Sequence, residues 1–306
     1  MGAWAVTENA EAQRETTGWV ALIFQPMSTS ARQLAERCAE GLSALGYEAR
    51  PMSAWELSPS SDNSGVRMAV TFGGDGTIIR AARWLAGTGT PILGVAMGKL
   101  GFLTELPPES ACDKLPDILA GNYWLDERLM VGARVHSVQE AAEPRGPGSD
   151  GASAADATPL VALNDVVIGR GASPKVVDID VMVDGVPLVH YVADGLILAT
   201  PTGSTAYSLS AGGPVLAPGV QGLLLVPLAP HLAVLKSLVV PLSAQIHVRA
   251  ASEQPPLMVL DGQEQIPLRN NQLVTVKIAR ERTLFARTGS RSSFYETLVQ
   301  SYNKKR

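Results

Sequence analysis

The sequence predicts a chain of two parts, an α/β domain built on a parallel sheet and a β-rich domain after it. In the first third, apolar runs typical of buried strands alternate with segments of helical periodicity. Beyond residue 160, short runs rich in Val, Ile and Leu follow one another, and Asp184-Gly185 between two of them is a hairpin signal. We expect the domains at 18–125 and 126–285, with a tail at 286–306 that packs on the first domain.

The first domain begins with an apolar run at 19–24, which we expect to be a strand. Residues 28–30 offer N-caps to a following helix, whose apolar positions recur at three- and four-residue spacing: Leu34, Cys38, Leu42 and Leu45. Further strands are expected at 66–70 and 91–95, on either side of a second helix. This alternation predicts a parallel sheet with right-handed crossovers.

The β-rich part contains several runs that read as strands, at 160–168, 176–183, 186–192, 196–200, 245–250, 256–260 and 273–279. Asp261-Gly262 is a second tight turn, and Asp261 is interpreted as a hairpin residue. Residues 139–159 are rich in Ala, Gly, Pro and Ser without periodicity, which predicts a mobile surface insertion. Phe294, Leu298 and Tyr302 are spaced as on one face of a helix near the end of the chain.

Composition excludes some classes of partner. The net charge of −4 over 306 residues argues against a general nucleic-acid binder. The most apolar region, 222–241, is interrupted by prolines, His231 and Lys236, so we expect core rather than a membrane span. Cys38 and Cys112 stand alone, without metal-ligand spacing, which fits a reducing cytoplasm.

The chemistry centres on a strand-to-helix turn, Gly73-Gly74-Asp75-Gly76-Thr77. Its glycines let backbone N–H groups converge ahead of a helix, which suits an anionic phosphate. A carboxylate at such a site is unfavourable unless it holds a metal ion or accepts a proton from an attacking hydroxyl. The turn therefore suggests phosphoryl transfer, and the alternative is a tight turn with Asp75 as a local cap.

Two other segments permit close approach of a ligand. Gly98 and Gly101 follow the strand at 91–95, where a ligand crevice is expected in open α/β sheets. The segment 194–214 is dense in glycine and hydroxyl residues and carries Tyr207, which can lie against a planar base. This mixture suits a nucleotide pocket, and the alternative is a Ser/Thr-rich turn leading to a helix.

These motifs stand in the same order as those of NAD kinases. The resemblance rests on 73–77, 98–103, Asn164-Asp165 and 194–214, and extends over about 19–286. It implies transfer of the terminal phosphate of ATP to the 2′-hydroxyl of the adenosine ribose of NAD, giving NADP. It also implies a divalent cation such as Mg²⁺, a homodimer or homotetramer in the cytoplasm, and no nucleic-acid or membrane partner. The expected fold is a Rossmann-like parallel α/β domain and a β-sandwich-like domain that bind NAD between them, with the C-terminal helix returning to the first domain.

The resemblance also implies roles for individual residues. Asp75 would be the catalytic base, and Gly73, Gly74, Gly76 and Thr77 would form the loop at the phosphates. Phe102 would pack on the adenine, Asn164 and Asp165 would hold ribose hydroxyls, and Asp194 would contact the nicotinamide part. Four residues would line the adenosine pocket: Thr205, Ala206, Tyr207 and Ser210. We expect no protein cluster of metal ligands.

Three positions depart from the family pattern. Ala96 stands where Asn is usual, Asp165 where Glu is usual, and Lys236-Ser237 where Arg-Pro is usual. Lys keeps the charge of Arg but loses its bidentate fork. Two alternatives stay open. A kinase of another hydroxyl acceptor, a lipid or a sugar, would share the glycine turn, and a catalytically silent dinucleotide sensor is suggested by Ala96 and Lys236. Polyphosphate stays open as an alternative donor.

Overall fold

The computed structural model describes residues 18–99, 101–136, 160–171, 174–231 and 235–303. The insertion predicted at 139–159 lies outside these residues.

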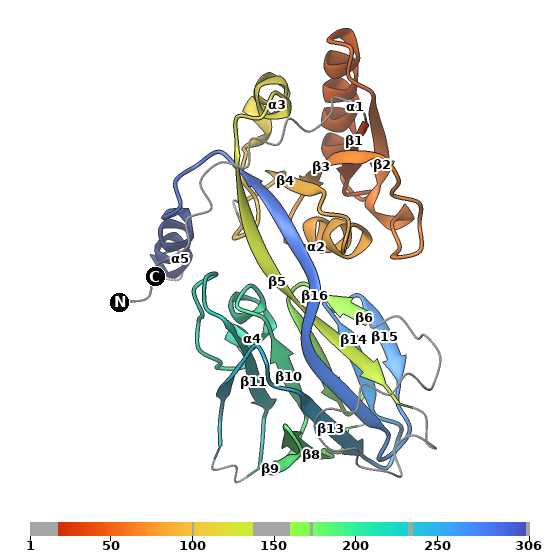
Figure 1. Ribbon diagram of the computed structural model, residues 1–306, viewed down its shortest axis with the longest axis vertical. Coiled ribbons are helices and arrows are strands. Elements are labelled where there is room, and N and C mark those ends of the chain that lie inside the picture. Colours follow the sequence, from red (N-terminus) through yellow and green to blue (C-terminus); the bar gives the residue numbers. More distant parts are fainter. Residues whose placement is uncertain (1–17, 100, 137–159, 172–173, 232–234, 304–306) are drawn as a thin grey trace.

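The first part of the chain is a parallel sheet with helices on both faces (Figure 1). Its strands lie in the order β2-β1-β3-β4: β1 (Trp19–Phe24), β2 (Ala49–Ser53), β3 (Val66–Gly73) and β4 (Pro91–Ala96). Its helices are α1 (Thr29–Ala44), α2 (Asp75–Trp84) and α3 (Ala111–Leu119), and short 3₁₀ turns lie at η1 (Ala54–Glu56) and η2 (Pro108–Ser110). Alternate residues of each strand point to opposite faces, so Leu22 and Val70 pack with α1 and α3, whereas Ala21 and Ala69 pack with α2.

Helices α1 and α3 are joined by a disulfide between Cys38 and Cys112. The expectation of isolated cysteines is therefore wrong. The two residues lie 74 positions apart in the sequence, and only the packing of both helices on one face of the sheet brings their Cα atoms within 4.9 Å.

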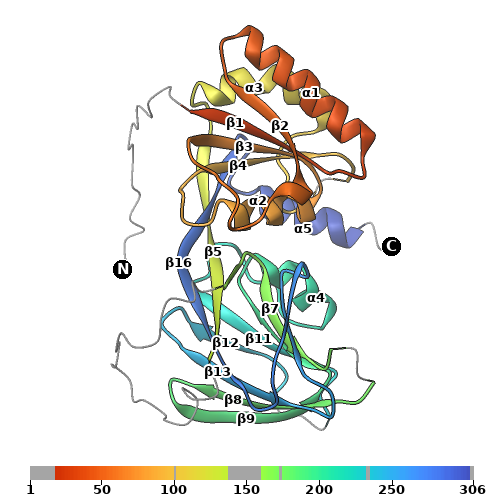
Figure 2. The ribbon, with the colours of Figure 1, turned by 90° about the vertical axis from the view of Figure 1, so that its right-hand side faces the viewer.

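Two long antiparallel strands, β5 (Trp124–Val135) and β16 (Leu273–Arg287), connect the two parts (Figure 2). The far end of β16 pairs in parallel with β4, and its beginning pairs with β13 (Ile246–Ala251). The expected strand at 273–279 thus continues to Arg287, past a shift of register between Ile278 and Arg282. One ten-stranded sheet therefore extends from the α/β part into the β-rich part.

The β-rich part is a sandwich of two sheets. Its half of the ten-stranded sheet adds three strands: β6 (Leu160–Ala162), β8 (Val177–Val183) and β9 (Val186–Ala193). The facing six-stranded sheet has the order β12-β11-β10-β7-β14-β15, with bounds β7 (Asp165–Gly169), β10 (Gly195–Ala199), β11 (Gly222–Leu228), β12 (Leu238–Pro241), β14 (Leu257–Leu260) and β15 (Glu264–Pro267). Ile179 and Val248 of one sheet share a core with Ile168 and Leu198 of the other. The predicted α/β and β-sandwich-like architecture is confirmed.

Short helices complete the fold. The 3₁₀ turn η4 (Gly203–Thr205) and α4 (Tyr207–Ser210) follow β10, and α5 (Ser293–Asn303) follows β16. The Phe294 ring of α5 lies 5.8 Å from the Phe102 ring, centroid to centroid, so the tail helix returns to the first domain as predicted. The apolar segment at 222–241 forms strands β11 and β12, and none of the described helices is long and apolar enough to cross a membrane.

Candidate active site

The glycine turn links the end of β3 to the start of α2. Gly73 is the last residue of the strand, Gly74 caps the helix without a side-chain hydrogen bond, and Asp75 is its first residue. A Cβ on Gly73 would meet Thr77 Oγ1 at 2.3 Å, so only glycine allows this approach. Gly74 and Gly76 are exposed. The turn therefore presents unobstructed backbone at a helix N-terminus.

Asp75 lies beneath the turn, against the loop that follows β4. The backbone amides of Phe102 and Leu103 stabilise its charged form, but the larger effect is burial, which raises the pKa of the Asp75 carboxyl. Its Oδ1 is buried without a hydrogen-bond partner among the described residues. A Cβ on Gly101 would meet that oxygen at 2.4 Å. Asp75 is thus confined to one position and keeps an oxygen available.

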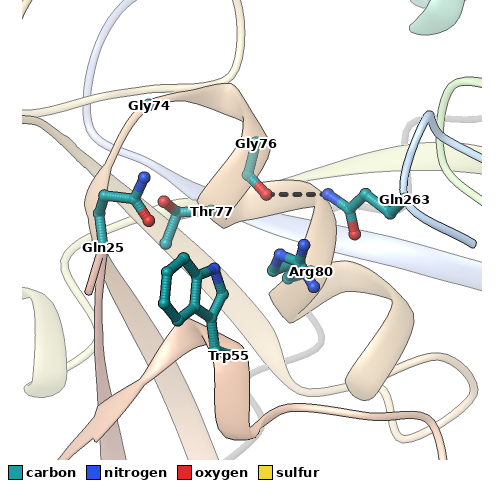
Figure 3. A pocket seen from close by; sticks show the side chains of 7 residues that line it. All are labelled: Gln25, Trp55, Gly74, Gly76, Thr77, Arg80 and Gln263. Carbon is teal, nitrogen blue, oxygen red and sulfur yellow. Dashed lines mark hydrogen bonds between the residues drawn. The ribbon is translucent and has the colours of Figure 1, made fainter. Parts of the chain in front are cut away.

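A pocket of about 310 Å³ opens on the outer side of the glycine turn (Figure 3). It is lined by Gln25, Trp55, Gly74, Gly76, Thr77, Arg80 and Gln263. Gln263 comes from the β-rich part, and its Nε2 donates a hydrogen bond of 3.1 Å to the carbonyl oxygen of Gly76. Arg83 of α2 also binds the β-rich part, through the carbonyl of Val161 at 3.1 Å and through Glu264. The phosphate-type loop is therefore held against the second domain.

A second pocket, of about 480 Å³, lies on the β-rich part. It contains five of the residues predicted to bind NAD: Asn164, Asp165, Asp194, Ala206 and Tyr207. Its other walls are Val167, Gly169, Arg170, Gly171, Leu228, Leu257, Val259, Asp261 and Gly262. The Tyr207 side chain is half-exposed, and Asn164 Oδ1 is buried without a partner among the described residues. An aromatic ring and an unused amide oxygen are suited to a nucleoside.

Asp261 supports this second pocket from below. It occupies a turn with φ 51°, followed by Gly262 with φ 66°, as the hairpin interpretation predicts. Its carboxylate also accepts hydrogen bonds from the backbone amides of Leu163 at 2.8 Å, Asn164 at 2.7 Å and Asp165 at 3.2 Å. The segment between β6 and β7 is therefore shaped by a side chain from the β14–β15 turn.

Two carboxyl groups lie close together at this point. Burial raises the pKa of Asp165 to about 7, and the charge of Asp261 contributes in the same direction. Burial also raises the pKa of Asp261, against the effect of its three backbone hydrogen bonds and of Arg83. At the rim of the pocket, Arg170 forms an ion pair of 2.9 Å with Asp194. The pocket thus offers a carboxyl that changes its charge near neutral pH.

The turn that carries Asp261 separates the two pockets. Asp261 and Gly262 line the second pocket, and the next residue, Gln263, lines the first. A group bound at the glycine turn and a group bound on the β-rich part would therefore meet beside one three-residue turn. Such an arrangement suits transfer of a group between two bound molecules.

Comparison with known proteins identifies the family. The family model of the ATP-NAD kinase N-terminal domain matches residues 56–123, and that of the C-terminal domain matches residues 163–288. An NAD kinase of Dehalococcoides mccartyi is 33% identical over 282 residues, which cover 91% of this chain and 94% of that protein. An NAD kinase of Chloroflexus aggregans is 34% identical over 92% of this chain and 96% of its own length. The chain belongs to the NAD kinase family. The predicted enzyme class, an ATP-dependent phosphotransferase, is thereby confirmed.

Solved structures of NAD kinases share the fold. The crystal structure of an NAD kinase from Archaeoglobus fulgidus in complex with ATP superposes with a TM-score of 0.71 at 25% identity, over 92% of this chain and 97% of that one. The structure of yeast NADH kinase complexed with NADH gives a TM-score of 0.73 at 24% identity, over 93% and 88% of the two chains.

The remaining predicted site residues line neither pocket. Gly73 and Asp75 belong to the glycine turn but line neither pocket, and Phe102 packs on Phe294 of α5. Thr205 donates its hydroxyl to the carbonyl of Thr202 at 3.1 Å, and Ser210 is exposed at the end of α4. Their roles as site residues stay predictions.

Sequence reasoning missed several residues that the fold brings to the two pockets: Gln25, Trp55, Arg80, Arg170 and Gln263. Each lies outside the motifs, and only the position of Arg80, one helical turn after the glycine turn, could have been found from local sequence. Within the described part of the chain, no group of three His, Cys, Asp or Glu side chains could hold a metal ion.

Proposed function

We propose that this chain transfers the terminal phosphoryl group of ATP to the 2′-hydroxyl of the adenosine ribose of NAD at the Asp261–Gln263 turn. The observation that carries the proposal is the adjacency of the two pockets on either side of that turn. ATP would bind at the glycine turn, where backbone N–H groups face the phosphates. NAD would bind in the larger pocket, with its adenosine beside Tyr207.

In this reaction the 2′-oxygen attacks the γ-phosphorus, and the bond from that phosphorus to the β–γ bridging oxygen breaks. ADP leaves, and the hydroxyl proton passes to the Asp75 carboxylate. Burial supports this role, because it raises the pKa of Asp75 towards the pH at which a general base works well. The neighbouring amides of Phe102 and Leu103 would keep the carboxylate in place.

NAD would be oriented by the segment that Asp261 shapes. Asn164 Oδ1, which has no partner among the described residues, would accept a hydrogen bond from a ribose hydroxyl. Asp165 would bind a second hydroxyl, and Asp194, held by Arg170 at the rim, would face the nicotinamide end. Tyr207 and Ala206 would pack against the adenosine, with Thr205 and Ser210 nearby in the same segment.

The residues present fit a divalent cation bound mainly by the substrate. Mg²⁺ is commonly held by one or two carboxylates together with substrate phosphates rather than by a cage of protein ligands. Asp75 Oδ1, buried and without a partner among the described residues, is the atom that would hold it. Bound Mg²⁺ would neutralise charge on the phosphate oxygens.

We also propose the domain limits 18–125, 126–285 and 286–306, a cytoplasmic location, and a homodimer or homotetramer. Val186 and Leu188 support the last point, because both are exposed on β9, which is an edge strand of the ten-stranded sheet. Light scattering of the purified protein would measure the assembly directly.

The test is NADP formation by the purified protein with ATP, Mg²⁺ and NAD, read through an NADP-specific coupled dehydrogenase, with Asp75→Asn in parallel. We expect product from the wild type and a kcat at least about a hundredfold lower in the variant, because a general base contributes on that order. The KM for NAD should change little. A variant with nearly wild-type kcat would remove Asp75 from the role of base.

The same assay separates the rival functions. A screen of lipid and sugar acceptors would reveal a kinase of another hydroxyl. A protein that gains thermal stability from NAD by mass action and yet forms no NADP would be a dinucleotide sensor.

A further inference from the structure

Trp55 is distinct among the tryptophans that the structure describes. The indole N–H groups of Trp19, Trp84 and Trp124 each donate to a backbone carbonyl, at 2.9, 3.1 and 2.9 Å. Trp55 makes no such hydrogen bond and no ring or cation contact with any described residue, and it is 60% exposed. Its ring lines the pocket at the glycine turn instead (Figure 3). An exposed indole ring that lines a pocket beside a phosphate-type loop is suited to stack on a planar base.

The backbone holds Trp55 in a defined place. The residue belongs to η1, directly after β2, and its amide donates a hydrogen bond of 3.2 Å to Ser53 Oγ. Strand β2 pairs with β1 through five successive residues, which fixes the loop to the parallel sheet. The ring therefore forms one wall of the pocket, across from the glycine turn, as Figure 3 shows.

Polar groups line the same pocket as that ring. Arg80 follows Gly76 by four residues, so both lie on one face of α2. Among the described residues Arg80 has no ion-pair partner, and Thr77 is 5% exposed with no hydrogen bond to its hydroxyl. An arginine without an ion-pair partner and the Thr77 hydroxyl, beside free backbone N–H groups, suit phosphate oxygens.

The balance of charge and aromatic surface decides which phosphate compound fits. A chain of inorganic phosphate carries charge at every unit and calls for several cations along its path. Arg80 is the one cationic side chain among the lining residues, and the rest of the wall is an indole and two amides, Gln25 and Gln263. Such a wall suits a planar base and a sugar, since base–aromatic stacking contributes about 1–3 kcal/mol per base.

We propose that Trp55 stacks on the base of the phosphate donor while Arg80 binds its phosphates, so that this pocket selects a nucleoside triphosphate over inorganic polyphosphate. The inference rests on the proposed function and adds to it the residues that choose the donor. The base on Trp55 belongs to the donor and not to NAD, because the Asp261–Gln263 turn separates this pocket from the one that contains Tyr207.

The experiment measures ATP binding by calorimetry and, at saturating NAD, the KM for ATP. Inorganic tripolyphosphate is tested in parallel as a donor and as an inhibitor competitive with ATP. The variants are Trp55→Ala, Trp55→Phe, Arg80→Ala and Leu45→Ala. Leu45 is a matched control, since it is also 60% exposed but lies at the C-terminal end of α1.

Loss of the ring should weaken ATP binding and raise the KM for ATP about tenfold, within the range of one stacked base. Trp55→Phe should retain most of the affinity for ATP. In Trp55→Ala the inhibition constant of tripolyphosphate should equal that of the wild type. Leu45→Ala should resemble the wild type in both measurements. Arg80→Ala should weaken both phosphate compounds. Trp55→Ala with unchanged ATP affinity, or with an equal loss for ATP and tripolyphosphate, would overturn the proposal.

Calorimetry distinguishes this failure from failure of the proposed function. If the wild type forms no NADP, the dissociation constant of ATP still reports on Trp55. If the wild type forms NADP and Trp55→Ala binds ATP with the wild-type affinity, the kinase assignment stands, but the proposed role of Trp55 is wrong.

Discussion

The Asp261 carboxylate accepts a hydrogen bond of 2.7 Å from the backbone amide of Asn164, a residue 97 positions earlier in the chain. Together with the amides of Leu163 and Asp165, this contact makes one carboxylate the support of the whole segment between β6 and β7. The residues proposed to hold the ribose of NAD thus depend on a side chain that need not touch NAD.

Asp261→Asn should lower both the stability and the affinity for NAD. An amide offers one acceptor oxygen where the carboxylate offers two, and its NH₂ group would face backbone donors. We expect a loss of about 1–3 kcal/mol in the free energy of unfolding, measured with urea, and a higher KM for NAD at an unchanged KM for ATP. Asp184→Asn is the matched control, since Asp184-Gly185 is a similar turn with positive φ and Asp184 also accepts a backbone hydrogen bond, from Gln245. An equal KM for NAD in both variants would contradict the role of Asp261.

Asp165 should make the stability of the protein depend on pH near neutrality. The pKa of this carboxyl is about 3.9 in the unfolded chain and about 7 in the folded protein. Between these values the folded state holds a proton that the unfolded state has lost. The stabilising contribution is therefore complete below about pH 4 and is lost as the pH rises through about 7. Asp165→Asn should reduce the decline in the free energy of unfolding between about pH 4 and about pH 7, and equal slopes of unfolding free energy against pH in the two proteins would refute the raised pKa of Asp165.

Gly101→Ala should impair catalysis by displacing Asp75. The new Cβ would lie 2.4 Å from Asp75 Oδ1 and 2.9 Å from Oδ2, so the carboxylate must move. A misplacement of about 1 Å lowers kcat roughly a hundredfold when the displaced carboxylate takes part in the reaction. Gly98→Ala, in the same loop, meets no atom within 4 Å and should keep nearly wild-type kcat. If Gly101→Ala retained full kcat and the wild-type melting temperature, Asp75 would not need its observed position.

Tyr207→Ala should weaken NAD binding, because the half-exposed ring is the aromatic surface of the larger pocket. Loss of one stacked base predicts a KM for NAD about tenfold higher, with kcat nearly retained. Tyr207→Phe keeps the ring and should resemble the wild type, which separates stacking from a role of the hydroxyl. An unchanged affinity in Tyr207→Ala would exclude this residue from the pocket.

Local features of the site were predictable from sequence. The turn around Asp75 is recognisable because strand, glycines and helix are contiguous, and the backbone conformation of a turn is set by its own residues. The same reasoning correctly identified Asp261-Gly262 as a hairpin turn and placed Asn164, Asp165 and Tyr207 in segments that the fold brings to one pocket.

Features that depend on long-range packing were not predictable. Asp261 contacts a segment almost a hundred residues away, and the Cys38–Cys112 pair requires two helices to share a face of the sheet. Trp55 and Gln263 reach the glycine turn only after β2 and the β14–β15 turn are in place. The sequence also does not reveal that β16 changes its neighbouring strand from β13 to β4 along its length. The predicted strand therefore ended at Ala279, whereas β16 continues to Arg287.

The course of β16 has a consequence for how the chain folds during synthesis. The parallel sheet of the first 96 residues has β4 as its outer strand until the segment that pairs with it, at Leu284 and Phe285, has left the ribosome. The ribosome adds about 5–20 residues per second while domains fold as units, the N-terminal one first, and an unpaired strand edge invites association with other chains. A nascent chain stalled before residue 284 therefore leaves Pro91 and Ile92 of β4 without their strand partner, although Gly94 and Ala96 already bond to the loop at Glu105 and Leu106.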